Sequence, residues 1–172
     1  MTRLARANRI LYVEPWVYLH PLLRQIHNGH ITWADMRGPR MRQVCENLYV
    51  YQPPLWAPRA ARFPLSVFTR ALYMFFLRHV LKRLDFHKPI LWLFLPDMEV
   101  FIGRFDEKLV IYHIVDEYAG YSGVDETWSS ILRRMEQQLA RRADLVFVTS
   151  PTLLEINGFN LENLAAGSSF EE

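Results

Sequence analysis

Apolar runs alternate along this chain with stretches that have helical periodicity. Five runs have the β-branched and aromatic composition of strands, and they occupy residues 9–14, 47–51, 89–95, 109–115 and 144–149. Most of them are almost entirely apolar, as in strands that are buried on both faces. Strands of this kind, separated by helices, predict an α/β fold with a parallel sheet and helices on both faces.

Helical periodicity extends furthest between Phe63 and Leu84. At 100° per residue, one side of this helix carries Phe68, Ala71, Phe75, Arg78 and Lys82. The other side, which we expect to face the core, carries Leu65, Leu72, Tyr73, Phe76, Val80 and Leu84. The aromatic and basic side allows two interpretations. It is ordinary surface covered by long basic side chains, or it is a patch that rests on anionic lipid.

Other elements are shorter or less regular. The pattern predicts the last turns of a helix at 2–7, a loop or short helix at 16–26, a loop at 28–39, and an amphipathic helix at 126–142. Asp97 is expected to cap a short helix at 98–104. Ser150 is expected to cap a brief helix that ends near Asn157, and residues 159–172 are expected to form a loose tail.

The predicted strands end at polar residues, which are Glu14, Gln52, Asp97, Asp116 and Ser150. In open α/β sheets, ligands bind outside the carboxyl ends of the strands, so we expect these five ends to open on one rim that forms the site. Asp116 follows the run at 109–115 and is a candidate general base. The alternative is that Asp116 only caps a turn and that Glu117 is solvated.

Composition and charge narrow the possible partners. The 172 residues are 51% apolar, enough for one domain with a core. Twenty basic and eighteen acidic residues are nearly balanced, and no nucleic-acid-binding signature is present, so nucleic acid is not an expected partner. The single cysteine, Cys45, excludes an internal disulfide and fits a reducing, cytoplasmic compartment. His79 and His87 stand apart from other ligands, so no metal site is expected, and no apolar run reaches the ~20 residues of a membrane helix.

Motifs for the common α/β chemistries are missing. LYVEPW stands where a G-x-G-x-x-G would follow the first strand of a dinucleotide-binding dehydrogenase. Neither the phosphate-binding G-x-x-x-x-G-K-[ST] nor the nucleophile elbow G-x-S-x-G occurs. These three classes of enzyme are therefore unsupported.

Five segments, in order and with helices between them, resemble one known family: RILYVEP, ENLYVYQPP, KPILWLFLP, KLVIYHIVDEYAGY and RRADLVFVTSP. They are similar to the N-terminal domain of bacterial GT-B glycosyltransferases that build cell-surface polysaccharides. The resemblance covers about residues 2–158, and we treat 1–158 as one partial domain. It implies a Rossmann-like fold that holds the acceptor, often a lipid-linked sugar. A C-terminal domain that is absent here binds the nucleotide-sugar donor, and no other cofactor is implied.

The same resemblance assigns roles to residues. Asp116 would take the proton from the acceptor hydroxyl in an inverting reaction, a role suited to a carboxylate with a raised pKa. The residues expected to support it or bind the acceptor are Glu14, Asp97, His113, Glu117, Tyr118 and Ser150. His113 lies inside its predicted strand, so simple packing is an equal alternative. The residues expected to contact the inner face of the plasma membrane are Arg70, Phe75, Arg78 and Lys82.

Two departures from the family pattern limit what we expect of the chain. The family's first strand, normally central in the sheet, is missing. Losing five or six buried residues at ~1.5 to 3 kcal/mol each is comparable to a domain's margin of ~5 to 15 kcal/mol, so we expect poor stability. No donor domain or E-x7-E donor site follows, so we expect no sugar transfer by this polypeptide alone. The alternative function is a non-catalytic Rossmann-like module that docks on a membrane or partner through the basic aromatic helix.

Overall fold

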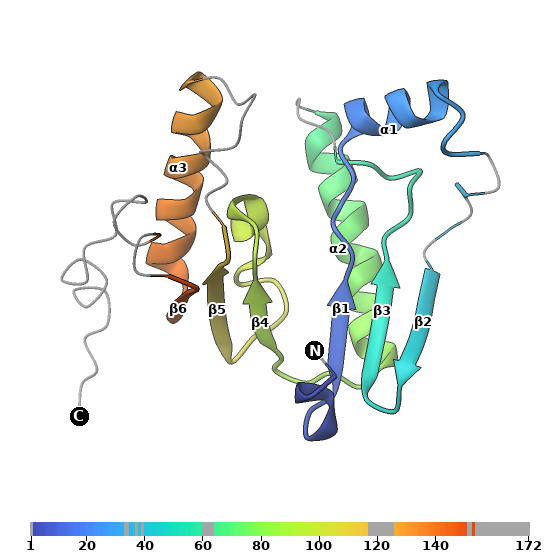
Figure 1. Ribbon diagram of the computed structural model, residues 1–172. Helices are drawn as coiled ribbons and strands as arrows, with labels where there is room; N and C mark the ends of the chain where they lie inside the picture. The colour runs from blue at the N-terminus through green and yellow to red at the C-terminus, as the bar shows by residue number, and fades with distance from the viewer. Residues whose placement is uncertain are drawn as a thin grey trace. The chain divides into compact units, whose positions relative to one another are not determined.

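The computed structural model of the chain describes residues 2–32, 35–36, 38, 40–59, 64–116, 126–150 and 153 (Figure 1). The chain divides into two compact units, Met1–Asp85 and Phe86–Glu172. The boundary between them falls inside the region 1–158, which was predicted to be one domain. Each unit contains a three-stranded sheet and helices, so the fold class is α/β, as predicted. The five predicted strand ends are therefore divided between two sheets.

The sheet of the first unit has the order β1-β3-β2. Strands β1 (Ile10–Val13) and β3 (Leu48–Gln52) are parallel, which confirms the strands predicted at 9–14 and 47–51. Pro15 follows β1 closely, and proline cannot donate to a strand ladder. Because β1 and β3 are parallel, their carboxyl ends lie at the same edge of the sheet.

The third strand, β2 (Arg40–Cys45), is the element that the sequence analysis did not predict. It runs antiparallel to β3, so this sheet is mixed rather than purely parallel. All six residues of β2 are exposed, and a two-residue turn at Glu46 and Asn47 joins it to β3. The side-chain amide of Gln43 donates a hydrogen bond to the Glu46 carbonyl across this turn at 2.9 Å. With no apolar run of its own, β2 takes its strand conformation from pairing with β3.

Three helices lie in the described part of the first unit. The helix expected at 2–7 is a short 3-10 turn, η1 (Leu4–Arg6), and the undecided segment at 16–26 forms α1 (Leu19–His27). The long helix predicted at 63–84 is confirmed as α2 (Leu65–Arg83), which Figure 1 shows running behind β1 and β3.

The outward side of α2 is exposed as the periodicity predicts, but on the predicted core face only Tyr73 and Val80 are buried. The buried residues of the whole helix are Thr69, Tyr73, Met74, Leu77 and Val80. Phe68 and Phe75 on the other side are 65% and 64% exposed. Leu65 was expected in the core but is 48% exposed, since it begins the helix at the end of the buried stripe.

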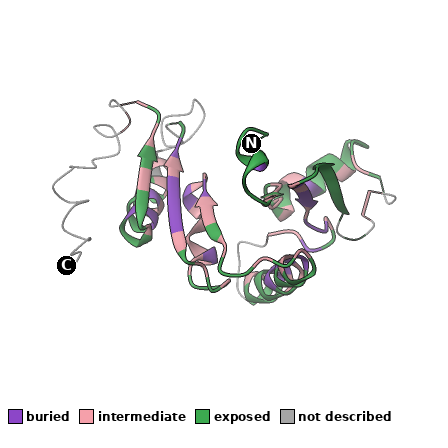
Figure 2. Cartoon of the chain, turned by 90° about the horizontal axis from the view of Figure 1, so that it is seen from below, coloured by how far each residue is buried: buried purple, intermediate pink, exposed green. Residues whose placement is uncertain are grey.

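The sheet of the second unit is parallel throughout, with the order β4-β5-β6. Its strands confirm three predictions and are β4 (Ile90–Leu93), β5 (Leu109–Ile114) and β6 (Leu145–Val148). Only β5 is mostly buried, and it appears purple along most of its length in Figure 2. Ile90 of β4 is 49% exposed and Phe147 of β6 is 44% exposed. The expectation that these two strands are buried on both faces is therefore wrong, because each is an outer strand of a small sheet.

Among the described residues between these strands there are two helices. Helix α3 (Glu126–Arg142) has the predicted bounds, and it packs on η2 and β5. The 3-10 helix η2 (Pro96–Phe101) replaces the helix predicted at 98–104. It begins at Pro96, so Asp97 lies within its first turn and is not the capping residue. Arg142 Nη1 lies 2.7 Å from Glu99 Oε1 and joins the end of α3 to η2.

Several predictions fall outside the described residues. These concern Glu117, Tyr118, the helix predicted from Ser150 to Asn157 apart from its first residue and Leu153, and the tail at 159–172.

Candidate functional site

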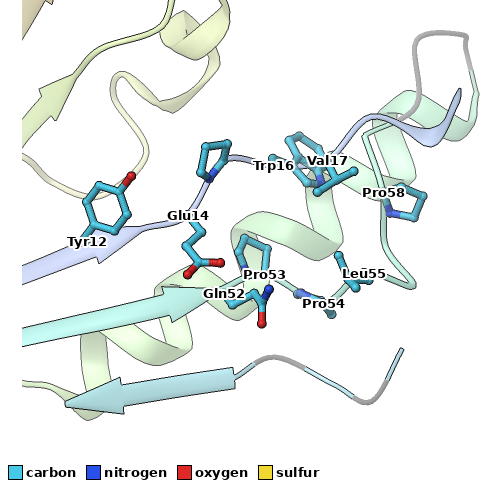
Figure 3. A pocket seen from close by; sticks show the side chains of 10 residues that line it. Tyr12, Glu14, Trp16, Val17, Gln52, Pro53, Pro54, Leu55 and Pro58 are labelled. Atoms are coloured by element: carbon cyan, nitrogen blue, oxygen red, sulfur yellow. The ribbon is translucent and has the colours of Figure 1, made fainter. Parts of the chain in front are cut away.

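A pocket of about 460 Å³ lies at the carboxyl ends of β1 and β3 (Figure 3). Its described lining residues are Tyr12, Glu14, Pro15, Trp16, Val17, Gln52, Pro53, Pro54, Leu55 and Pro58. This is the edge where parallel α/β sheets bind ligands. It belongs entirely to the first unit, and it includes Glu14, one of the predicted acceptor-binding residues.

Two planar polar side chains stand at the strand ends. Glu14 directly follows β1, and its backbone N–H donates to the Tyr51 carbonyl at 2.9 Å, which holds it beside the end of β3. Gln52 is the last residue of β3, and Figure 3 shows its amide together with the Glu14 carboxylate at this edge. The carboxylate accepts hydrogen bonds, while the amide both donates and accepts. A ligand rich in hydroxyl groups matches this pair.

The aromatic wall of the pocket is held in place by several contacts. The Trp16 ring lies 4.4 Å from the Tyr73 ring, centroid to centroid, at an angle of 32°. Trp16 Nε1 donates to the Ala57 carbonyl at 2.9 Å. The Arg59 guanidinium lies 5.7 Å from the centroid of the Trp16 ring and 5.0 Å from that of Tyr18, within the range of cation–π attraction. These contacts fix the position of the Trp16 ring at the pocket.

Two buried tyrosines lie near this wall. Burial raises the pKa of Tyr51 to about 12, because a phenolate loses more hydration than a phenol when it is buried. Burial likewise raises the pKa of Tyr73, with a further contribution from Tyr51. Both hydroxyls are therefore neutral near pH 7, and Glu14 is the carboxylate among the described lining residues.

A second group of predicted residues lies at the carboxyl edge of the second sheet. Asp116 is exposed just after β5, and Ser150 is half-buried just after β6. Thr149 ties the two strand ends together, since its N–H donates to the Ile114 carbonyl at 3.2 Å and its hydroxyl to the Val115 carbonyl at 3.3 Å. The structure thus brings Asp116 and Ser150 to one edge, as predicted. Asp97 is half-buried in η2, the element that follows β4.

His113 lies within β5 and not at the edge of the sheet. Its ring is 5.4 Å from that of Phe94, 6.0 Å from that of Trp92 and 6.2 Å from that of Phe147. This aromatic cluster supports the interpretation of His113 as a packed residue, which the sequence left open.

The outward side of α2 carries a hollow of about 240 Å³. It is lined by Ala71, Phe75, Arg78, His79 and Lys82, and Arg70 is exposed on the same helix. Three of the four predicted membrane-contact residues therefore lie together. No helix in the described part of the chain, α2 included, has the length and apolar content needed to cross a bilayer.

Tyr12 and Trp16 line the pocket and Arg42 lies beside its residue Glu14, but none of the three was predicted from the sequence. Tyr12 could have been found, because side chains alternate along a strand and this places Tyr12 on the same face of β1 as Glu14; Trp16 follows shortly after. Arg42, whose Nη2 lies 3.8 Å from Glu14 Oε1, comes from the unpredicted strand β2, and no pattern in the sequence indicated it.

Comparison with known proteins gave no match, since no family model, curated protein or solved structure is similar to this chain. Among the described residues, no group of three His, Cys, Asp or Glu side chains is arranged to hold a metal ion.

Proposed function

We propose that this chain forms the acceptor-binding part of a sugar transferase with Rossmann-like, GT-B architecture. The observation that supports it best is the composition of the pocket at the ends of β1 and β3. A sugar ring has apolar C–H faces and a rim of hydroxyls. The apolar side chains that line the pocket, Trp16 among them, suit the faces, and the Glu14 carboxylate and Gln52 amide suit the hydroxyls. The volume of about 460 Å³ is typical of small-molecule sites.

In the second unit, Asp116 is proposed as a general base that would take a proton from a hydroxyl group. Its exposure at a strand end gives it access to solvent and ligand. Ser150 at the same edge, with Asp97 in η2, would hydrogen-bond to the molecule that carries this hydroxyl. The nucleotide-sugar donor would be bound by a further domain.

Sugar binding is tested by titrating the protein with a panel of monosaccharides. The Trp16 indole N–H resonance, assigned with a Trp16→Phe variant, reports the pocket by nuclear magnetic resonance. We expect saturable shifts in the wild type and an affinity about 10-fold lower in Glu14→Ala, which removes the hydroxyl acceptor. Glu46→Ala, an exposed glutamate of the same unit, is the matched control and should bind as the wild type does. No shift with any sugar, or equal affinity in Glu14→Ala, would refute the proposal.

A second candidate function, docking on an anionic lipid surface, is favoured by the outward side of α2. Phe68 and Phe75 are exposed there to 65% and 64%, and Phe75 shares its hollow with Arg78 and Lys82. Exposed aromatic residues beside basic ones are typical of helices that lie in the membrane interface. Docking is compatible with sugar binding. If it occurs without sugar binding, the chain is a non-catalytic module.

Flotation with vesicles of phosphatidylglycerol and phosphatidylcholine tests this docking. The wild type should float with anionic vesicles, less so at high salt, and not with pure phosphatidylcholine. The double variant Phe75→Ser with Arg78→Gln should no longer float with anionic vesicles. The control Leu23→Ser with Arg24→Gln alters an exposed apolar and basic pair on α1 and should float as the wild type does. Undiminished flotation of the Phe75 and Arg78 variant would exclude this surface.

A further inference from the structure

Strand β2 brings two arginines to the pocket. Arg42 pairs with Val50, which pairs in turn with Tyr12 of β1, and Arg40 pairs with Gln52. Directly opposed residues of neighbouring strands project from the same face of a sheet. Arg40 and Arg42 therefore stand on the face that carries the pocket residues Tyr12 and Gln52. The ion pair between Arg42 and Glu14 confirms this placement for Arg42.

The contact of Arg42 with Glu14 leaves most of the guanidinium available. The Nη2 to Oε1 distance of 3.8 Å is longer than a charge-assisted hydrogen bond, and the Arg42 side chain is 73% exposed. A guanidinium has five N–H donors in a planar fork that matches a carboxylate or a phosphate. One loose contact to one carboxylate oxygen uses little of that capacity. Arg40 Nη2 lies 3.7 Å from Asp35 Oδ1, and both side chains are about half exposed.

The charges divide the site into two parts. Glu14 at the strand end repels an anion placed inside the pocket but accepts hydrogen bonds from hydroxyls. Arg42 and Arg40 lie to the β2 side of Glu14 and Gln52, and they attract an anion there. A ligand with a neutral polyhydroxyl ring and one negative group beside it satisfies both parts.

We propose that the acceptor is a sugar that carries an anionic group, which Arg42 binds with Arg40 contributing positive charge. The group is a carboxylate, as in a uronic acid, or a phosphate ester on the ring. This inference rests on the proposed sugar pocket and adds the chemical class of its ligand. Arg42 acts as a specificity residue, since it discriminates charged from neutral acceptors.

The test compares three probes of one ring type: glucose, glucuronate and glucose 6-phosphate. Each is titrated at low ionic strength while the Trp16 indole resonance is followed. The wild type should bind at least one of the two anionic sugars about 5- to 10-fold more tightly than glucose. The tighter of the two identifies the anion as carboxylate or phosphate.

Variants of Arg42 separate this effect from sugar binding itself. Arg42→Gln should lose the preference for the anionic sugars and bind all three probes with equal affinity. Arg42→Lys, which keeps the charge but loses the fork, should retain part of the preference. The control Arg83→Gln, at an exposed site in the last turn of α2, should keep it in full.

Three results would overturn the inference: equal affinity of the wild type for all probes, a preference that survives in Arg42→Gln, or inorganic phosphate that binds as tightly as glucose 6-phosphate. The last would show that the anion is recognised without the ring. Failure of glucose to shift Trp16 at any concentration would instead count against the sugar pocket. The two proposals can thus fail separately.

Discussion

Two buried tyrosines link the pocket to the core of the first unit. Tyr51 on β3 is 2% exposed and Tyr73 on α2 is 3% exposed, and Tyr73 stacks on the Trp16 ring of the pocket wall. Burial raises the pKa of both phenols, for Tyr51 to about 12. Packing at these two residues therefore depends on their remaining protonated.

The raised tyrosine pKa values predict a loss of stability at alkaline pH. Below about pH 10 both phenols are neutral in the folded and unfolded chain, and their packing contributes fully. As pH rises from about 10 through about 12, the unfolded chain releases these protons first, so the folded state is disfavoured. Urea unfolding at pH 9 and pH 11 should show this loss in the wild type and a smaller one in Tyr51→Phe with Tyr73→Phe. An equal loss in both proteins would show that other groups cause it.

The general-base role proposed for Asp116 can be tested by substitution. In a form of the protein that transfers sugar, Asp116→Asn should lower kcat by about 10²- to 10⁴-fold, the usual contribution of a general base. Asp106→Asn is the control, since Asp106 is an exposed aspartate in the turn before β5. A kcat that Asp116→Asn leaves unchanged would remove Asp116 from the mechanism.

Among the elements, α3 shows how far a helix face can be read from periodicity. Its bounds are as predicted, and its residue Leu139 is fully buried. Ile131, another apolar residue of α3, is 38% exposed. The apolar residues of α3, which packs on η2 and β5, are therefore not buried along its whole length.

This difference along α3 predicts unequal costs for two similar substitutions. Leu139→Ala should destabilise the protein by about 2 to 5 kcal/mol, because it leaves a cavity in a packed core. Ile131→Ala should cost less than about 1 kcal/mol, because the side chain is already partly hydrated. Urea unfolding of the two variants measures both values. Similar costs would mean that Ile131 is covered in solution.

On the scale of the whole molecule, each unit has one central strand. Strand β3 lies between β1 and β2, and β5 lies between β4 and β6. The buried patterns of β3 and β5 agree with this position, whereas β2 is exposed along its length and β6 at alternate residues. Both cores are thus organised around a strand that is hydrogen-bonded on both sides.

Amide hydrogen exchange should reflect this organisation. The slowest-exchanging amides of each unit should fall in β3 and β5, because opening them disrupts a whole sheet. Amides of β2 and β6 should exchange faster, because an outer strand can detach alone. Equal protection of β2 and β3 would show that β2 is covered by something outside the described residues.

Local sequence pattern was enough to predict the elements whose secondary structure is determined by residues close to one another in the sequence. The apolar runs of β1, β3 and β5 and the periodicity of α2 and α3 determine secondary structure through properties of contiguous residues. The placement of Glu14, Asp116 and Ser150 at strand ends follows from the same runs. Asp97 was misplaced as a cap because η2 begins at Pro96, and element boundaries depend on small differences in local energy.

The features that only the tertiary structure decided depend on contacts between residues that are distant in the sequence. Strand β2 forms by pairing with β3, and Arg42 meets Glu14 through that pairing. Strands β4 and β6 are partly exposed because each is an outer strand of the sheet among the described residues. By itself the sequence determined the other strands, the long helices and the acids that end the strands. Pairing and burial, which depend on residues far apart in the sequence, decided that a carboxylate, a fixed aromatic ring and a nearby guanidinium meet at the pocket.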